Sequence, residues 1–282
     1  MQSRYSRIPA HLNSRIEVSD GLAISRFSLE RDFSFIPGQY ATLWLTHRGK
    51  TLGRPYSIAS SPYETRTIEF YINLVKEGKL TPSLWQPEVI EGLIRGNPET
   101  KAAIMGPSGL FGLDAEDPRD FVFVASGTGL APFISMVRKM DQDSRTQKGF
   151  LKRRIYIVHG VSYPKHLGYR EELEALAAET AGGLKRKLAL LYLPTISRPF
   201  IDSTWTGLKG RAESLFDLSS IRKTGPPEFE DTIKKMLHLM IRPETHAVYI
   251  CGHPGTVDNV VSALARKGFR PESDLKCEKY YP

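Results

Sequence analysis

Residues 121–132 read Phe-Val-Phe-Val-Ala-Ser-Gly-Thr-Gly-Leu-Ala-Pro, an apolar run followed by a glycine-rich turn. The apolar run predicts a buried strand over Phe121–Ala125. Beyond the turn, apolar residues recur at i, i+3, i+4 and i+7 and predict a helix that buries Phe133, Met136, Val137 and Met140. A strand, a tight turn and a helix in this order form the opening unit of a parallel α/β sheet.

The chain that follows repeats this alternation of strand and helix. Apolar runs predict strands at Ile155–Val158, Leu188–Leu193 and Ala247–Ile250. Helices are expected around Tyr169–Glu179 and after the last of these strands, where the inward residues are Val257, Val260, Val261 and Leu264. Because parallel strands need long crossovers, this order predicts a doubly wound parallel sheet with helices on both faces.

Ligands bind such a sheet at the carboxyl ends of its strands. The loops expected there are Ser126–Pro132, His159–Pro164 and Cys251–Gly255. The segment Asp202–Pro243 is longer than a simple crossover and contains a predicted helix at Phe229–Met240. It is either an insertion that modifies contact with a partner or a passive surface excursion.

The first part of the chain has a different pattern, in which short β-branched and aromatic runs alternate with turn residues. The predicted strands are Ile16–Leu29, Tyr40–Thr46, Tyr56–Ala59, Thr67–Val75 and Ala102–Met105. Short antiparallel strands at this spacing favour a small barrel. The acidic stretch at 114–118 separates the two patterns, so we expect one domain at 1–115 and a second at 116–282.

Composition restricts the classes of function. The chain has 282 residues, a net charge of +8, a pI near 9.4 and only two cysteines. Two thiols cannot hold an iron–sulfur cluster, and we expect no metal site. No apolar stretch is long enough for a membrane span, so we expect a cytoplasmic protein with no membrane partner. The basic residues are dispersed apart from 152–154 and 185–187, which we interpret as solvated strand entrances, so we expect no nucleic-acid partner.

Two motifs carry residue types suited to binding phosphates and rings. In Gly127-Thr128-Gly129 the missing Cβ atoms would let a ligand approach backbone N–H groups at the start of a helix, although packing alone also explains such a turn. In Arg54-Pro55-Tyr56-Ser57 the alternation of a strand places Arg54 and Tyr56 on one face and Ser57 on the other. An arginine fork suits a pyrophosphate, but an ordinary edge strand would show the same alternation.

Several motifs occur in one order along nearly the whole chain: Pro37-Gly38-Gln39-Tyr40, Arg54-Pro55-Tyr56-Ser57, Gly78-Lys79-Leu80-Thr81, Gly127-Thr128-Gly129-Leu130-Ala131-Pro132, Cys251-Gly252 with Pro254, and Glu278-Lys279-Tyr280-Tyr281. With these motifs the chain resembles the ferredoxin–NADP reductases, specifically the bacterial ferredoxin/flavodoxin type. The resemblance implies an N-terminal FAD-binding β-barrel followed by an NADP-binding α/β domain.

The resemblance also implies roles for individual residues on the flavin side. Arg54 would hold the FAD pyrophosphate, Tyr56 would pack on the flavin, and Ser57 would hydrogen-bond near flavin N5. Thr128 would lie where flavin and nicotinamide meet. The further FAD contacts that the resemblance implies are Tyr71, Ile72, Asn73 and Leu74 on a strand, Lys79, Leu80 and Thr81 in a loop, and Tyr280 and Tyr281 in the tail, which would otherwise be a frayed end.

For NADP(H), the resemblance implies that Arg198 and Arg211 bind the 2′-phosphate. Ser162 stands where similar enzymes often carry an arginine, and it would contribute a hydrogen bond without charge. Cys251 would lie beside the nicotinamide, and Glu278 would relay protons through Ser57. The dinucleotide-binding set is completed by Gly127, Gly129 and Gly252.

We therefore expect hydride transfer between NADPH and FAD N5, followed by single-electron exchange with an acidic ferredoxin or flavodoxin, by a monomeric enzyme. A basic protein suits an acidic carrier because complementary fields speed encounter. One alternative is the FAD-containing NAD(P)H reductase component of an oxygenase system. An alternative of another class is a non-enzymatic basic binding module.

Overall fold

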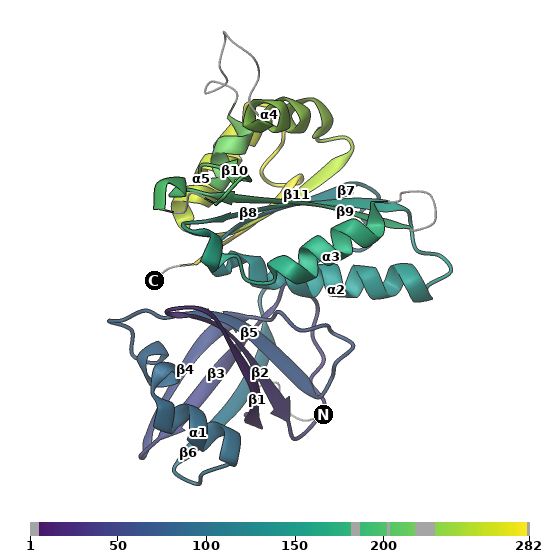
Figure 1. Cartoon of the computed structure of the whole chain (residues 1–282). Coiled ribbons are helices and arrows are strands. Elements are labelled where there is room, and N and C mark those ends of the chain that lie inside the picture. Colours follow the sequence, from purple (N-terminus) through teal and green to yellow (C-terminus); the bar gives the residue numbers. More distant parts are fainter. Residues whose placement is uncertain (1–5, 182–186, 202–203, 218–228, 281–282) are drawn as a thin grey trace. The chain divides into compact units, whose positions relative to one another are not determined.

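The computed structural model describes residues 6–181, 187–201, 204–217 and 229–280, and these form two six-stranded sheets (Figure 1). The chain divides into two compact units. The first comprises the residues up to Leu113 together with Ala131–Lys139, and the second comprises Asp114–Leu130 and Met140–Tyr281. The functional division into domains at 1–115 and 116–282 stays a prediction.

The first unit is an antiparallel barrel, as the short strands predict. Its sheet has the order β4-β3-β6-β1-β2-β5, and an antiparallel bridge between Ile58 and Phe70 joins the two edges. Closure of this kind removes the exposed edges of an open sheet. The strands are β1 (Ile8–Ser19), β2 (Leu22–Leu29), β3 (Tyr40–His47), β4 (Lys50–Ser57), β5 (Thr67–Asn73) and β6 (Thr100–Ser108).

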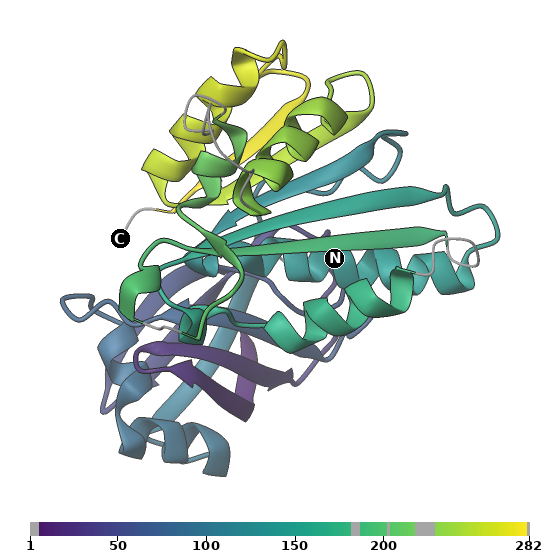
Figure 2. The same ribbon diagram turned by 45° about the horizontal axis from the view of Figure 1, so that its top comes forward.

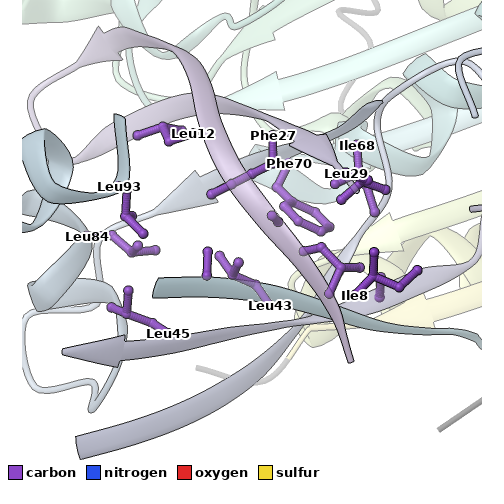
Figure 3. Packing of buried hydrophobic residues seen from close by; sticks show 14 of the residues in the cluster. Ile8, Leu12, Phe27, Leu29, Leu43, Leu45, Ile68, Phe70, Leu84 and Leu93 are labelled. Atoms are coloured by element: carbon purple, nitrogen blue, oxygen red, sulfur yellow. The ribbon is translucent and has the colours of Figure 1, made fainter. Parts of the chain in front are cut away.

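Alternate residues of these strands fill the barrel interior (Figure 3). Leu12, Phe27, Leu43 and Phe70 are each at most 4% exposed. The helix α1 (Pro87–Arg95), which follows the short 3₁₀ helix η1 (Thr81–Trp85), adds Val89 and Leu93 to the same cluster. The sequence analysis did not predict this helix.

The predicted single strand Ile16–Leu29 is wrong, because this region is a hairpin made of β1 and β2. The two strands pair antiparallel, and Gly21 adopts a φ of +77° at the turn. An Asp-Gly pair at 20–21 is a strong hairpin signal that the apolar pattern concealed. The strand predicted from Tyr56 begins earlier, at Lys50.

The second unit contains the predicted doubly wound parallel sheet, in the order β10-β9-β8-β7-β11-β12. Every described pairing in it is parallel. The order starts at β7, proceeds to β10 on one side and continues with β11 and β12 on the other, so its topological switch point lies between β7 and β11. The strands are β7 (Asp120–Ser126), β8 (Arg153–Val161), β9 (Leu188–Ile196), β10 (Leu208–Lys209), β11 (His246–Gly252) and β12 (Leu275–Lys279).

Helices cover both faces of this sheet, with α3 on one face and α4 and α5 on the other (Figure 2). The residues predicted to face inward on α2 are buried, since Phe133, Met136, Val137 and Met140 are at most 3% exposed. None of the described helices has the length and apolar character needed to cross a membrane. The helices are α2 (Ala131–Thr146), α3 (Arg170–Thr180), α4 (Phe229–Met240) and α5 (Pro254–Ala265), with 3₁₀ turns η2 (Gly127–Leu130), η3 (Pro164–His166), η4 (Pro199–Ile201) and η5 (Ala212–Phe216).

Two interpretations of surface segments are wrong. The segment Asp202–Pro243 is not a passive excursion, because its residues Leu208, Leu215 and Leu237 are at most 3% exposed within the core of the second unit; its residues 202–203 and 218–228 lie outside the described structure. Arg153 is not a solvated strand entrance, because it is 5% exposed and its Nη1 donates to the carbonyls of Asp117 and Arg119 at 2.7 and 3.0 Å. Residues 185 and 186 of the other basic group lie outside the described residues.

Candidate functional site

In the first unit, β4 presents the predicted flavin motif as the alternation of a strand requires. Arg54 lies opposite Leu43 and Tyr56 lies opposite Ala41, so both are on one face, while Ser57 is on the other and is 7% exposed. Within the described structure, the exposed Arg54 side chain donates to the carbonyl of Gly53 alone, at 2.8 Å. No carboxylate among the described residues pairs with its guanidinium group.

Tyr56 lies half-buried against the barrel core, with its ring centroid 5.8 Å from that of Phe70. Burial raises the pKa of Tyr56, against the smaller opposing effect of the Arg54 charge. The phenol is therefore neutral at physiological pH and presents a ring and a hydroxyl rather than a charge.

The other residues predicted to contact FAD have different degrees of access. Tyr71 and Ile72 on β5 are 3% and 0% exposed, and Leu80 is 1% exposed within the barrel core. For Ile72 and Leu80, only backbone groups can therefore contact a ligand. Asn73 and Lys79 are exposed, and Leu74 is half-buried.

Thr81 holds the predicted phosphate loop closed. Its Oγ1 accepts a hydrogen bond from the N–H of Val75 at 3.1 Å and donates to the carbonyl of Val75 at 3.0 Å. The hydroxyl is therefore committed to the loop, and the exposed Lys79 is the side chain of this loop with charge available for phosphate.

In the second unit, the turn after β7 and the turn after β11 meet at the switch point of the sheet. An ideal Cβ on Gly129 would lie 2.3 Å from the carbonyl oxygen of Cys251, and one on Gly252 would lie 2.3 Å from Ser126 Oγ. The missing side chain of Gly129 thus makes room for backbone, not for a ligand as the sequence suggested. By contrast, nothing lies within 4 Å of a Cβ built on Gly127, whose φ is +56°.

Further hydrogen bonds tie these turns together. Ser126 Oγ accepts from the N–H of His253 at 2.8 Å, and the N–H of Tyr280 donates to the carbonyl of Gly252, also at 2.8 Å. The helix α5 begins at Pro254 with His253 as its N-cap. Its N-terminus therefore brings a partial positive charge to this edge of the sheet.

Cys251 and Glu278, both predicted to be catalytic, lie side by side on β11 and β12. Their Cα atoms are register partners, and Cys251 Sγ donates to Glu278 Oε2 at 3.8 Å. Cys251 is 0% exposed, and burial, with the Glu278 charge as the next cause, raises the pKa of its thiol. The sulfur is therefore a neutral thiol and not a nucleophile. Ser57, the third predicted catalytic residue, belongs to the other unit.

The chain is ordered as far as Tyr280, because Glu278 and Lys279 belong to β12 and the N–H of Tyr280 donates to the carbonyl of Gly252. Thr128, in the 3₁₀ turn η2, is half-buried. Tyr281 lies outside the described residues.

The residues predicted to bind the 2′-phosphate follow neighbouring strands at the carboxyl edge. The N–H of Arg198 donates to the carbonyl of Ser162 at 3.1 Å, and Arg198 Nη1 donates to the hydroxyl of Tyr163 at 2.9 Å. Arg211 is exposed, and its Nη1 lies 3.9 Å from the Glu213 carboxylate. Arg198 has no carboxylate partner among the described residues.

The sequence analysis missed His159, which lies at the carboxyl end of β8. This imidazole is 0% exposed, with Nε2 3.2 Å from the carbonyl oxygen of Gly127 and Nδ1 3.2 Å from the hydroxyl of Tyr192. Burial lowers the pKa of His159 to about 4, against the opposing effect of the Gly127 hydrogen bond. The only sequence signal was a histidine directly after an apolar run at the expected ligand edge.

The donor set of each unit fits the cofactor that the resemblance implies for it. In the first unit, Arg54 offers an uncompensated cation to a pyrophosphate, and Tyr56 offers a ring against the flavin. In the second, the open space at Gly127 and the Arg198 cation suit a phosphorylated dinucleotide at the switch point of a parallel sheet.

Comparisons with known proteins agree with this arrangement. A family model described as the oxidoreductase FAD-binding domain matches residues 9–111, and one described as the oxidoreductase NAD-binding domain matches residues 123–262. The chain is 28% identical over 252 residues to ferredoxin–NADP reductase A of Sorangium cellulosum, covering 89% of this chain and 80% of that protein. It is also 28% identical over 258 residues to the phenol hydroxylase P5 protein of Acinetobacter pittii, covering 90% of this chain but only 60% of that longer protein.

Among solved structures, a ferredoxin NADP+ reductase from Neisseria gonorrhoeae with bound FAD and NADP has the same fold. The TM-score is 0.70 at 19% identity, covering 99% of this chain and 100% of that one. The matched domains occur in the order in which the barrel and the parallel sheet occur here. The chain therefore belongs to the ferredoxin–NADP reductase family of FAD- and NAD-binding oxidoreductases.

Proposed function

We propose that this oxidoreductase exchanges a hydride between NADPH and FAD and passes electrons singly to a ferredoxin or flavodoxin. The observation that carries the proposal is the Cys251–Glu278 pair, which lies beside the β7–β11 switch point in a domain of the NAD-binding family. When bound, FAD supplies the chemistry that links a two-electron donor to a one-electron carrier.

On the flavin side, the residues of the chain bind and orient. Arg54 holds the pyrophosphate through its planar fork, since no carboxylate of the described structure competes for it. Tyr56 packs on the flavin, and the hydroxyl of Ser57 hydrogen-bonds near N5. Lys79 neutralises phosphate charge, while the backbone of the β5 strand and of the 79–81 loop lines the remainder of the site.

On the nicotinamide side, Cys251 supports the ring for transfer of the hydride and takes no covalent part. Its buried neutral thiol, held by the Glu278 carboxylate, suits van der Waals contact and a weak hydrogen bond rather than nucleophilic attack. Glu278 accepts or releases a proton at its Oε2 atom.

The proposed preference for NADP(H) over NAD(H) depends on Arg198 and Arg211. A dianionic 2′-phosphate makes charge-assisted hydrogen bonds with guanidinium groups that a 2′-hydroxyl cannot make. Arg198 already has its backbone tied to Ser162 and its side chain tied to Tyr163, so little freedom is lost on binding. Ser162 contributes a hydrogen bond without charge.

Steady-state kinetics with both nucleotides tests this assignment. Arg198→Ala and Arg211→Ala should each raise the KM for NADPH at least about tenfold and leave the KM for NADH within about twofold. Arg145→Ala is the matched control, because Arg145 is in the same unit but pairs with Asp141 and Glu179. An equal loss with both nucleotides would overturn the phosphate assignment.

The proposed carrier is acidic, and the proposed enzyme is a cytoplasmic monomer. The net charge of +8 suits an acidic ferredoxin or flavodoxin, and such attraction weakens as salt screens it. Free cysteines at 251 and 277 are compatible with a reducing compartment. A rate of carrier reduction that does not change with ionic strength would contradict the electrostatic part.

A second candidate is the reductase component of an oxygenase system, favoured by the match to the phenol hydroxylase P5 protein. In that case the electrons would go to an oxygenase or to its own ferredoxin, not to a general carrier. Comparing the kcat/KM for a flavodoxin, a plain ferredoxin and an oxygenase ferredoxin separates the two candidates, since each predicts a different preferred acceptor.

A further inference from the structure

His159 is a buried histidine that the proposed reaction does not use, and its two hydrogen bonds determine its protonation. The carbonyl oxygen of Gly127 can only accept, so the Nε2 that lies 3.2 Å from it carries the hydrogen. In the neutral ring, Nδ1 is then the acceptor for the hydroxyl of Tyr192. The Gly127 carbonyl thereby selects this tautomer, and the Tyr192 hydroxyl supports it by donating to Nδ1.

The bond to Gly127 determines the orientation of a peptide group at the switch point. In a planar trans peptide, the carbonyl of Gly127 and the N–H of Thr128 point in opposite directions. A carbonyl held toward His159 therefore turns the Thr128 N–H away from β8. This N–H is among the first of η2, where helical N–H groups have no acceptor within the helix.

Gly127 needs such a restraint more than its neighbour does. Gly129 is held by close contact with the Cys251 carbonyl, whereas a Cβ on Gly127 would meet nothing within 4 Å. Glycine also loses more conformational freedom on ordering than any other residue. Besides the backbone bonds of η2, the imidazole is therefore a side-chain restraint on the Gly127–Thr128 peptide, and its loss would loosen that peptide.

We infer that His159 is a positioning residue of the dinucleotide site, which holds the Gly127 carbonyl so that the Thr128 N–H faces the nicotinamide half of the bound nucleotide. The inference rests on the proposed function, because that function makes this turn a nicotinamide site. It assigns His159 no contact with the nucleotide. Tyr192 acts in turn on His159.

Calorimetric titration of the FAD-loaded protein with NADP+ and, separately, with 2′-AMP tests the inference without measuring activity. 2′-AMP carries the 2′-phosphate but no nicotinamide, so it reports only on the Arg198 and Arg211 edge. His159→Leu should weaken NADP+ binding about tenfold, the effect of losing one buried hydrogen bond and its orientation, and leave the 2′-AMP affinity within about twofold. His159→Gln retains an N–H donor and should recover most of the NADP+ affinity.

Tyr192→Phe provides a second variant in case His159→Leu does not fold. It removes the hydroxyl that donates to Nδ1 and supports the ring orientation, and should weaken NADP+ binding about threefold, with 2′-AMP binding unchanged. Thr180→Val is the matched control, because Thr180 is 1% exposed and its hydroxyl donates to Leu176 and accepts from Leu190, away from the turn. It should lower stability without changing either affinity.

Two results would overturn the inference. One is unchanged NADP+ affinity in Tyr192→Phe and, where it folds, in His159→Leu. The other is an equal loss of NADP+ and 2′-AMP affinity, which would indicate general damage. Failure of the unmodified protein to bind NADP+ at all is a different result, which would overturn the proposed function and the inference with it.

Discussion

Gly129→Ala tests how closely the two turns at the switch point are packed. The new Cβ would lie 2.3 Å from the carbonyl oxygen of Cys251 and 2.6 Å from its carbonyl carbon. Both neighbours are backbone atoms, so no side-chain rotation can relieve the clash. Reaching an ordinary contact of 3.4 Å requires the turn and the end of β11 to separate by about 1 Å.

Overpacking of this kind costs about 1–3 kcal/mol of the free energy of unfolding. A displacement of about 1 Å at Cys251 should also lower kcat/KM for NADPH by up to about a hundredfold, since misplacement by that distance has such effects in active sites. The assays are urea unfolding and steady-state reduction of an artificial electron acceptor by NADPH.

Gly149→Ala is the matched control, because nothing lies within 4 Å of its Cβ position and its backbone is not left-handed. Its unfolding free energy should stay within about 0.5 kcal/mol of the unmodified value. If Gly129→Ala were as stable as this control and kept full kcat/KM, the packing account of the turn would be refuted.

Three further predictions concern an arginine, a histidine and the two thiols of the second unit. Arg153→Met should lower the free energy of unfolding by about 2–4 kcal/mol, because it leaves the carbonyls of Asp117 and Arg119 without their donor. The control Lys152→Ala should change this free energy by under about 0.5 kcal/mol. Equal effects of the two substitutions in urea unfolding would contradict the prediction. Because the folded pKa of His159, about 4, lies below the unfolded value of 6.5, its neutral form contributes fully above pH 6.5 and the contribution is lost as the pH falls toward 4. Between pH 6.5 and 4, the free energy of unfolding of the unmodified protein should therefore fall by about 3 kcal/mol more than that of His159→Gln. Parallel profiles of unfolding free energy against pH would contradict a buried, neutral His159. In a thiol titration of the native protein, Cys277 should react slowly, because partial desolvation of its thiol raises its pKa to about 11, and Cys251, which is 0% exposed, should react only after unfolding. Rapid modification of both thiols in native protein would be inconsistent with the structure.

Elements with a strong apolar period could be predicted from the sequence. The strand β7 and the helix α2 were predicted because a continuous apolar run and a 3.6-residue period have few competing interpretations. The helix predicted at Phe229–Met240 has the same bounds in the structure. By contrast, β12 was not predicted. It lies at the edge of its sheet, and its sequence Leu-Lys-Cys-Glu-Lys has too few apolar residues to give a strand pattern.

The candidate site was predictable to the extent that motifs mark it. Motif order placed Cys251 and Glu278 among the functional residues, but only strand pairing shows that they are adjacent in β11 and β12. Gly129 was assigned to ligand approach because sequence does not show which atoms occupy the space left by a missing Cβ. His159 was missed because its role depends on a backbone carbonyl and on Tyr192 of another strand. Such pairings depend on tertiary structure and have no local pattern.

The most direct test of the proposed function is the visible absorption spectrum of the purified protein, recorded anaerobically before and after addition of NADPH and, separately, of NADH. The account predicts a yellow protein whose flavin absorption is bleached by NADPH at concentrations where NADH has little effect. A colourless protein that does not take up FAD, or a flavoprotein that neither nucleotide reduces, would contradict the proposed reaction.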